Sequence, residues 1–210
     1  WTLTASIEQA DTPSGLLILL MLMGAMGIGA MVAAEVVHRR RALSLLGPRP
    51  LALRQFLRVA AAVGLLYLVI AALPPWGLAG DLQPGLPPGL WITLLPLTLI
   101  ALLIQTGSEE LLFRGYLQSH LAARFQHPAV WLTVPAALFA MGHYAPDLYG
   151  SNAWLIAAWA FAFGIAAADL TARAGTLGPA IALHLVNNFA AIAVMGMEGE
   201  MSGLALYTLP

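Results

Sequence analysis

The stretch LLILLMLMGAMGIGAMVAAEVVHRRR, residues 16–41, decides the fold class. Residues 16–37 contain a single charged side chain, Glu35, and a histidine and three arginines follow them directly. A transmembrane helix needs about 20 mostly apolar residues to cross about 30 Å of hydrocarbon. The run is too long for the apolar part of a cleaved signal peptide, which has about 7 to 15 residues. The sequence therefore predicts a membrane helix that stays in the mature protein.

The composition agrees with a membrane protein. Of the 210 residues 60% are hydrophobic and only 9% are charged, whereas a soluble domain has about 25% charged residues. The formal net charge is −1 and no basic run is longer than residues 39–41, so the clustered cations that bind nucleic acid are missing. The sequence contains neither cysteine nor lysine. This excludes disulfides, thiolate metal sites, cysteine nucleophiles and lysine Schiff bases.

Five further apolar segments follow the first one. They cover about residues 56–73, 90–125, 128–143, 153–171 and 179–195. The first of these five ends at the proline pair Pro74-Pro75. The next continues through the polar residues 105–110, and we expect one long helix there with a kink at Gly107. The predicted fold class is all-α: a polytopic transmembrane helix bundle of about six spans, with a core of four helices around a polar intramembrane site.

The arginines predict the orientation of the chain, because cytoplasmic loops of membrane proteins retain positive charge. Every arginine except Arg114 lies in or beside a loop on one side. The charged residues in the loops of the other side are all acidic. Both termini are therefore expected outside the cytoplasm, with the polar site accessible from the cytoplasmic side. The small size and the absence of lysine suggest a prokaryotic protein, integral to the inner (plasma) membrane.

Several ionisable residues remain at membrane depth, where an unpaired charge costs several kcal/mol. They are Glu109, Glu110, Arg114, His143, Asp169 and His184. Glu109 and His143 lie equally far along the chain from the turn near Gln126, so antiparallel helices would hold them at one depth. His184 and Asn188 follow about two to three turns into the last segment. Three helices are therefore predicted to converge on one polar pocket.

Each of these helices carries a pair of residues four apart, which lie on the same helix face. The pairs are Glu110 with Arg114, Phe139 with His143, and His184 with Asn188. Arg114 neutralises Glu110 in this interpretation, while Glu109, about 100° around the helix, points elsewhere. Burial raises the pKa of a carboxyl group, and a carboxyl group with a raised pKa suits general-base catalysis. The two histidines and the asparagine supply donors or ligands for a water molecule, a metal ion or an oxyanion.

The three pairs also form three spaced motifs: EExxxR at residues 109–114, FxxxH at 139–143 and HxxxN at 184–188. In this order, on separate membrane helices, they resemble the CAAX protease and bacteriocin-processing family, which includes the type II CAAX prenyl endopeptidases. The resemblance covers about residues 108–188. It implies a catalytic helical core over residues 90–210, preceded by two transmembrane helices and a basic cytoplasmic loop in residues 1–89, all within one membrane domain.

The resemblance implies an enzyme: an intramembrane peptidase of the CAAX-processing type, a hydrolase. It would cut near the C-terminus of a membrane-associated peptide or protein, lipidated or not, surrounded by membrane lipids. Glu109 looks like the carboxylate that activates water. His143, His184 and Asn188 look like the rest of the catalytic site, and Glu110 with Arg114 look like its support.

The cofactor stays open at this point, because the family has been interpreted both as metalloproteases and as glutamate proteases. Glu109, His143 and His184 would satisfy a three-ligand zinc site, but no HExxH pair lies on one helix. If Glu109 were a ligand, the remaining carboxylate, Glu110, would already be held by Arg114. The residues therefore slightly favour a metal-free mechanism over one divalent ion such as zinc.

Two other classes of protein fit parts of the pattern. A non-catalytic peptide-binding or bacteriocin-immunity membrane protein needs no residue that a protease lacks. A proton-coupled transporter would use Glu109 and His143 as a relay, but no internal repeat is visible in the sequence. Asp169 with Arg173, four residues apart, is interpreted as a structural pair at a helix end.

Overall fold

The computed structural model describes residues 3–74, 76–77 and 79–210. Almost every regular element in these ranges is helical, which confirms the predicted all-α class. Four apolar helical stretches are long enough to cross a membrane, and two shorter apolar helices accompany them. Pro75, the second residue of the proline pair expected to end the second segment, lies outside the described residues.

The first span, Pro13–Val37, consists of three consecutive helical segments. They are α2 (Pro13–Leu22), α3 (Gly24–Val32) and the π-helical η1 (Ala33–Val37), and the short α1 (Leu3–Gln9) precedes them. Thr12 begins this span, because its hydroxyl oxygen accepts a hydrogen bond from the Gly15 amide. A side-chain acceptor at this position satisfies an amide that has no partner within the helix.

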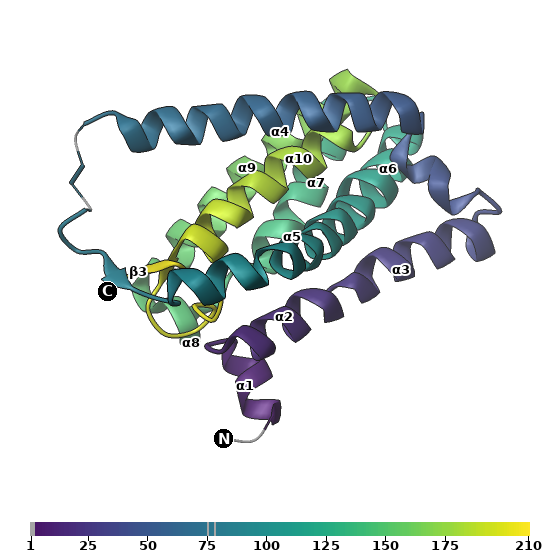
Figure 1. The fold of residues 1–210 in the computed structure, drawn as a ribbon. Helices are drawn as coiled ribbons and strands as arrows, with labels where there is room; N and C mark the ends of the chain where they lie inside the picture. Colours follow the sequence, from purple (N-terminus) through teal and green to yellow (C-terminus); the bar gives the residue numbers. More distant parts are fainter. Residues whose placement is uncertain (1–2, 75, 78) are drawn as a thin grey trace. The chain divides into compact units, whose positions relative to one another are not determined.

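The second span is α4 (Arg49–Ala72), one unbroken helix (Figure 1). The third stretch, Pro88–Arg124, has 37 residues and joins α5 (Pro88–Glu110), η3 (Leu111–Gln118) and α6 (Ser119–Arg124). Gly107 lies within α5. The irregular segment is therefore not the predicted kink at Gly107 but the π-helical η3, which begins directly after Glu110.

The remaining helices complete the predicted set. They are α7 (Pro128–Met141), α8 (Pro146–Tyr149), α9 (Ala153–Ala174), α10 (Gly178–Asn188) and the π-helical η5 (Phe189–Val194), with short 3₁₀ turns at η2 (Ala42–Leu46) and η4 (Gly150–Asn152). At about 1.5 Å per residue, the 14 residues of α7 extend about 21 Å, less than the hydrocarbon thickness. Because α7 ends at Met141, His143 lies in the turn after it, whereas the sequence predicted an apolar segment that reaches residue 143.

Three very short strands form a small sheet that the sequence did not predict. They are β1 (Gln83–Pro84), β2 (Met195–Met197) and β3 (Tyr207–Leu209), in the order β1-β3-β2. β3 pairs antiparallel with β1 and parallel with β2. The sheet thus joins the loop before α5 to the end of the chain.

The chain divides into two compact units, each assembled from separate parts of the sequence. The first comprises Trp1–Gly24, Val59–Gly107 and Leu183–Pro210, and the second Ala25–Arg58 and Ser108–Ala182. The core of the first unit includes Leu16, Leu102 and Leu204. The core of the second is a cluster around Phe139 and Ala160. The division into residues 1–89 and 90–210 stays a prediction.

Within the second unit, α7 and α9 pack closely because Gly164 has no side chain. A Cβ atom at Gly164 would lie 2.9 Å from the Cβ of Ala136. Small residues allow membrane helices to approach each other in this way.

We expect Gly164→Val to lower the free energy of unfolding by about 1–3 kcal/mol, because the added atoms would force α7 and α9 apart. Thermal unfolding of the purified protein in detergent measures this. Gly64→Val in α4 is the matched control, since nothing lies within 4 Å of a Cβ there. Equal melting temperatures for the two variants would contradict the close packing at Gly164.

Candidate active site

A buried ion pair lies where α5 passes into η3. One guanidinium nitrogen of Arg114, Nη1, donates to the Glu110 carboxylate at 2.9 Å, and both side chains are fully buried. The other terminal nitrogen, Nη2, donates to the Gly164 carbonyl oxygen at 3.3 Å. The guanidinium also lies over the Phe139 ring, 4.8 Å from its centre. Arg114 therefore links η3 to both α7 and α9.

His143 is held by the residue four positions before it. Its Nδ1 atom lies 2.8 Å from the Phe139 carbonyl oxygen, and the two rings are 4.4 Å apart. Since a carbonyl oxygen only accepts, Nδ1 carries the proton in this bond. In a neutral imidazole this leaves the Nε2 lone pair as an acceptor or base. The FxxxH motif thus fixes the tautomer as well as the position of His143.

Glu109 is buried, with 2% of its surface exposed, and it directly precedes Glu110 in the last turn of α5. Glu109, Glu110, Arg114 and His143 all belong to the second unit. Phe139 contacts both Arg114 and His143. Two of the three motifs, EExxxR and FxxxH, are therefore joined through one aromatic ring.

The third motif lies in the first unit. His184 is buried, with 3% exposed, and Asn188 follows one turn later on α10. The Nδ2 of Asn188 donates to the Oε1 of Gln105 at 3.0 Å. The neighbouring Asn187 has a different partner: its Oδ1 accepts a hydrogen bond from the Tyr67 hydroxyl at 2.9 Å. The HxxxN motif is thus attached to α5 through Gln105.

The sequence motifs did not include Gln105, the hydrogen-bond partner of Asn188. It is buried in α5, and it lies four residues before Glu109, on the same face of that helix. A polar side chain at membrane depth and in register with a motif residue was the available signal. Such residues are rare in membrane helices unless they have a partner.

Asp169 and Arg173 form the second pair of oppositely charged residues four apart. The Nε of Arg173 lies 2.7 Å from the Oδ2 of Asp169. The Arg173 side chain is 78% exposed and the Asp169 side chain is 47% exposed. The pair lies near the end of α9, as expected for a structural contact at a helix end.

Within the described ranges, no group of three or more His, Asp or Glu side chains is arranged to hold a metal ion. Glu109 and His143 share the second unit, whereas His184 belongs to the first.

The described helices define a helical membrane protein in which two adjacent glutamates, Glu109 and Glu110, are buried and Glu110 pairs with Arg114. Residues 89–190 match the family of type II CAAX prenyl endopeptidases described as Rce1-like. The matched region includes all three motifs, and the match confirms the resemblance seen in the sequence. No curated protein and no solved structure matches the chain.

Proposed function

We propose that the protein is an intramembrane endopeptidase that cuts near the C-terminus of a membrane-associated peptide or protein. The observation that carries this proposal is the burial of Glu109 beside the Glu110–Arg114 ion pair, in a region that matches a protease family. A buried carboxylate next to an already neutralised one is a suitable general base. We further propose that substrates enter from the cytoplasmic side of a prokaryotic inner membrane.

In the proposed reaction, Glu109 removes a proton from water and the hydroxide oxygen bonds to the peptide carbonyl carbon. The carbonyl oxygen becomes negative, and donors from His184 and Asn188 stabilise it. Glu109 then passes the proton to the leaving nitrogen as the carbon–nitrogen bond breaks. The products are a new carboxylic acid and a new amine, and transfer of the acid proton to the amine gives a carboxylate and an ammonium group, so atoms and charges balance.

The described hydrogen bonds leave the motif residues able to fill these roles in the proposal. The bond of Asn188 to Gln105 uses one amide hydrogen and leaves the second for the oxyanion. The Nδ1 bond of His143 to Phe139 leaves Nε2 to orient the attacking water. Arg114 holds Glu110 in place, which orients the helix end that carries Glu109.

The experiment that tests this function is cleavage of a quenched-fluorescence lipopeptide library by the purified protein in detergent. We expect cleavage by the wild type and a loss of about 100-fold or more in His184→Ala, because an oxyanion donor is removed. A chelator should leave the rate unchanged. Loss of cleavage with chelator, restored by zinc, would contradict the metal-free reaction.

An absence of product from every peptide, with a protein that melts cooperatively, would contradict the peptidase and favour a peptide-binding or immunity role. Full activity of His184→Ala would contradict the proposed oxyanion site. The exposed Glu198 supplies a control, since Glu198→Gln should cleave as the wild type does.

A further inference from the structure

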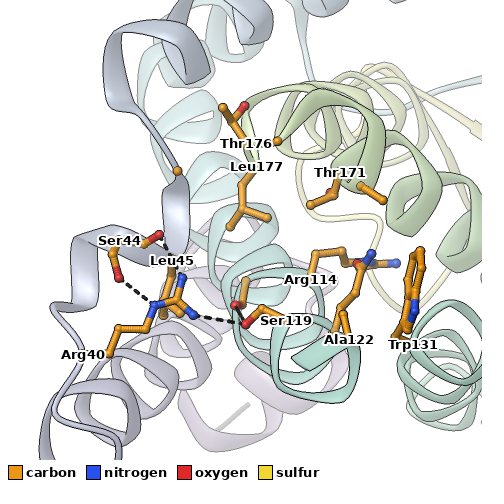
Figure 2. A pocket seen from close by; sticks show the side chains of 15 residues that line it. Arg40, Ser44, Leu45, Arg114, Ser119, Ala122, Trp131, Thr171, Thr176 and Leu177 are labelled. Atoms are coloured by element: carbon orange, nitrogen blue, oxygen red, sulfur yellow. Dashed lines mark hydrogen bonds between the residues drawn. The ribbon is translucent and has the colours of Figure 1, made fainter. Parts of the chain in front are cut away.

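The second unit contains a cavity apart from the proposed catalytic carboxylates. It has a volume of about 370 Å³, within the range of small-molecule sites. Its polar lining includes Arg40, Ser44, Gln118, Ser119 and Thr171, and the inner wall includes Arg114. Figure 2 shows Arg40 and Ser119 on one side of this space and Arg114, Thr171 and Trp131 on the other.

Arg40 brings a positive charge to the cavity, and the described lining contains no carboxylate. Its three described hydrogen bonds go to neutral oxygens: the hydroxyl of Ser44 at 2.8 Å, the carbonyl of Ser44 at 3.1 Å and the hydroxyl of Ser119 at 3.3 Å. Among the described residues it forms no ion pair. Arg114 is already neutralised by Glu110, so Arg40 gives the cavity a net positive charge that favours an anion.

Three polar atoms of the lining are buried without a hydrogen-bond partner among the described residues. They are the Nε of Arg114, the Oε1 of Gln118 and the Oγ1 of Thr171. Arg114 and Gln118 are only 2% and 4% exposed. The Nε2 of Gln118 donates to the Ala168 carbonyl at 2.8 Å, whereas its Oε1 accepts no described hydrogen bond. Buried polar atoms without partners indicate a missing ligand or water.

The position of the cavity in the sequence places it at one edge of the membrane. Its lining comes from the loop after the first span, the end of Pro88–Arg124, the start of α7 and the turn between α9 and α10. Because consecutive spans alternate in direction, all of these helix ends lie on the same membrane side. This is the side on which the arginines lie, and lipid head groups occupy that level.

We propose that this cavity binds the head group of an anionic phospholipid that also carries hydroxyl donors, such as phosphatidylglycerol. The phosphate would accept from Arg40, and the hydroxyl groups would donate to the unsatisfied oxygens of Gln118 and Thr171. The Nε–H of Arg114 would donate to a head-group oxygen. Leu45, Leu177 and Trp131 supply apolar walls for the glycerol backbone.

The mixture of donors and acceptors favours this class of ligand. Inorganic phosphate offers no acyl chain for the apolar wall, and phosphatidylcholine has a phosphate but no donor for Gln118. A phosphatidylglycerol head group matches the charge, the acceptors and the donors together. The assignment does not depend on the proposed peptidase activity.

The test is titration of the purified protein in detergent with phosphatidylglycerol, followed by native mass spectrometry. We expect one retained lipid, bound at least about fivefold more tightly than phosphatidylcholine. Arg40→Gln should weaken binding roughly tenfold, because a charge-assisted hydrogen bond is lost. Arg41→Gln is the matched control, since Arg41 is its exposed neighbour and does not line the cavity. Thermal unfolding checks that each variant is folded.

The outcomes are distinct. Equal weakening by Arg40→Gln and Arg41→Gln would indicate general attraction to anionic surfaces and would overturn the site. Displacement of the lipid by equimolar inorganic phosphate, or by a peptide with a free C-terminal carboxylate, would overturn the lipid assignment. If Arg40→Gln fails to fold, Ala122→Trp replaces it. Ala122 also lines the cavity, and a bulky side chain there should abolish binding while Arg40 stays in place.

Discussion

Glu109→Gln is expected to reduce kcat by about 10²–10⁴-fold, the usual contribution of a positioned general base. Glutamine preserves the size of the side chain but cannot take a proton from water. The KM should stay near that of the wild type, because binding of the substrate does not depend on this proton transfer. Steady-state cleavage of the best lipopeptide, measured in detergent, provides both constants.

Two comparisons make this result specific to Glu109. The exposed Glu198 provides a control for the loss of one carboxylate, and Glu198→Gln should behave as the wild type. The melting temperature of Glu109→Gln should also match the wild type within a few degrees. A well-folded Glu109→Gln protein with normal kcat would falsify the role of Glu109 as the base.

Arg114→Ala is expected to cause the largest loss of stability, about 3–5 kcal/mol, because it leaves the Glu110 charge buried and uncompensated. Arg114 also donates to Gly164 and lies over the Phe139 ring, so its removal disconnects η3 from α7 and α9. The change is measured as the shift in chemical or thermal unfolding of the detergent-solubilised protein.

The exposed Asp169–Arg173 pair is a matched control, with the same spacing in α9. Arg173→Ala should change stability little, because water screens exposed ion pairs and solvates the charge that remains. The double variant Glu110→Gln with Arg114→Ala should recover part of the loss, since no buried charge is then left unpaired. Equal destabilisation by Arg114→Ala and Arg173→Ala would contradict the importance of burial.

The helical class was predictable because the physics of the bilayer requires apolar stretches of a minimum length. The predicted second segment, residues 56–73, corresponds to α4 (Arg49–Ala72), and the predicted fifth, residues 153–171, corresponds to α9 (Ala153–Ala174). The beginning of α4 was missed because its first turns contain arginines. These belong to the helix but lack the apolar signal that marks a span.

Parts of the site were less predictable. The spacing of four residues correctly predicted the contacts of Arg114 with Glu110 and of His143 with Phe139. The bond from Asn188 to Gln105 joins residues far apart in the sequence, and no local pattern encodes such a partner. The small sheet was missed for a similar reason, because strands of two or three residues carry no periodic signal. The catalytic roles stay predictions until the variants are assayed.

The π-helical segment η3 has a consequence for how this chain tolerates insertions and deletions. A π-helix closes its hydrogen bonds one residue later than an α-helix, so it holds extra residues in each turn. Removing one residue from Leu111–Gln118 would let the segment relax towards an α-helix, and the tighter winding would compensate for most of the lost residue. Removing one residue from the regular helix α5 would instead rotate everything after it by about 100°. Single-residue deletions should therefore be tolerated better within η3 than within α5.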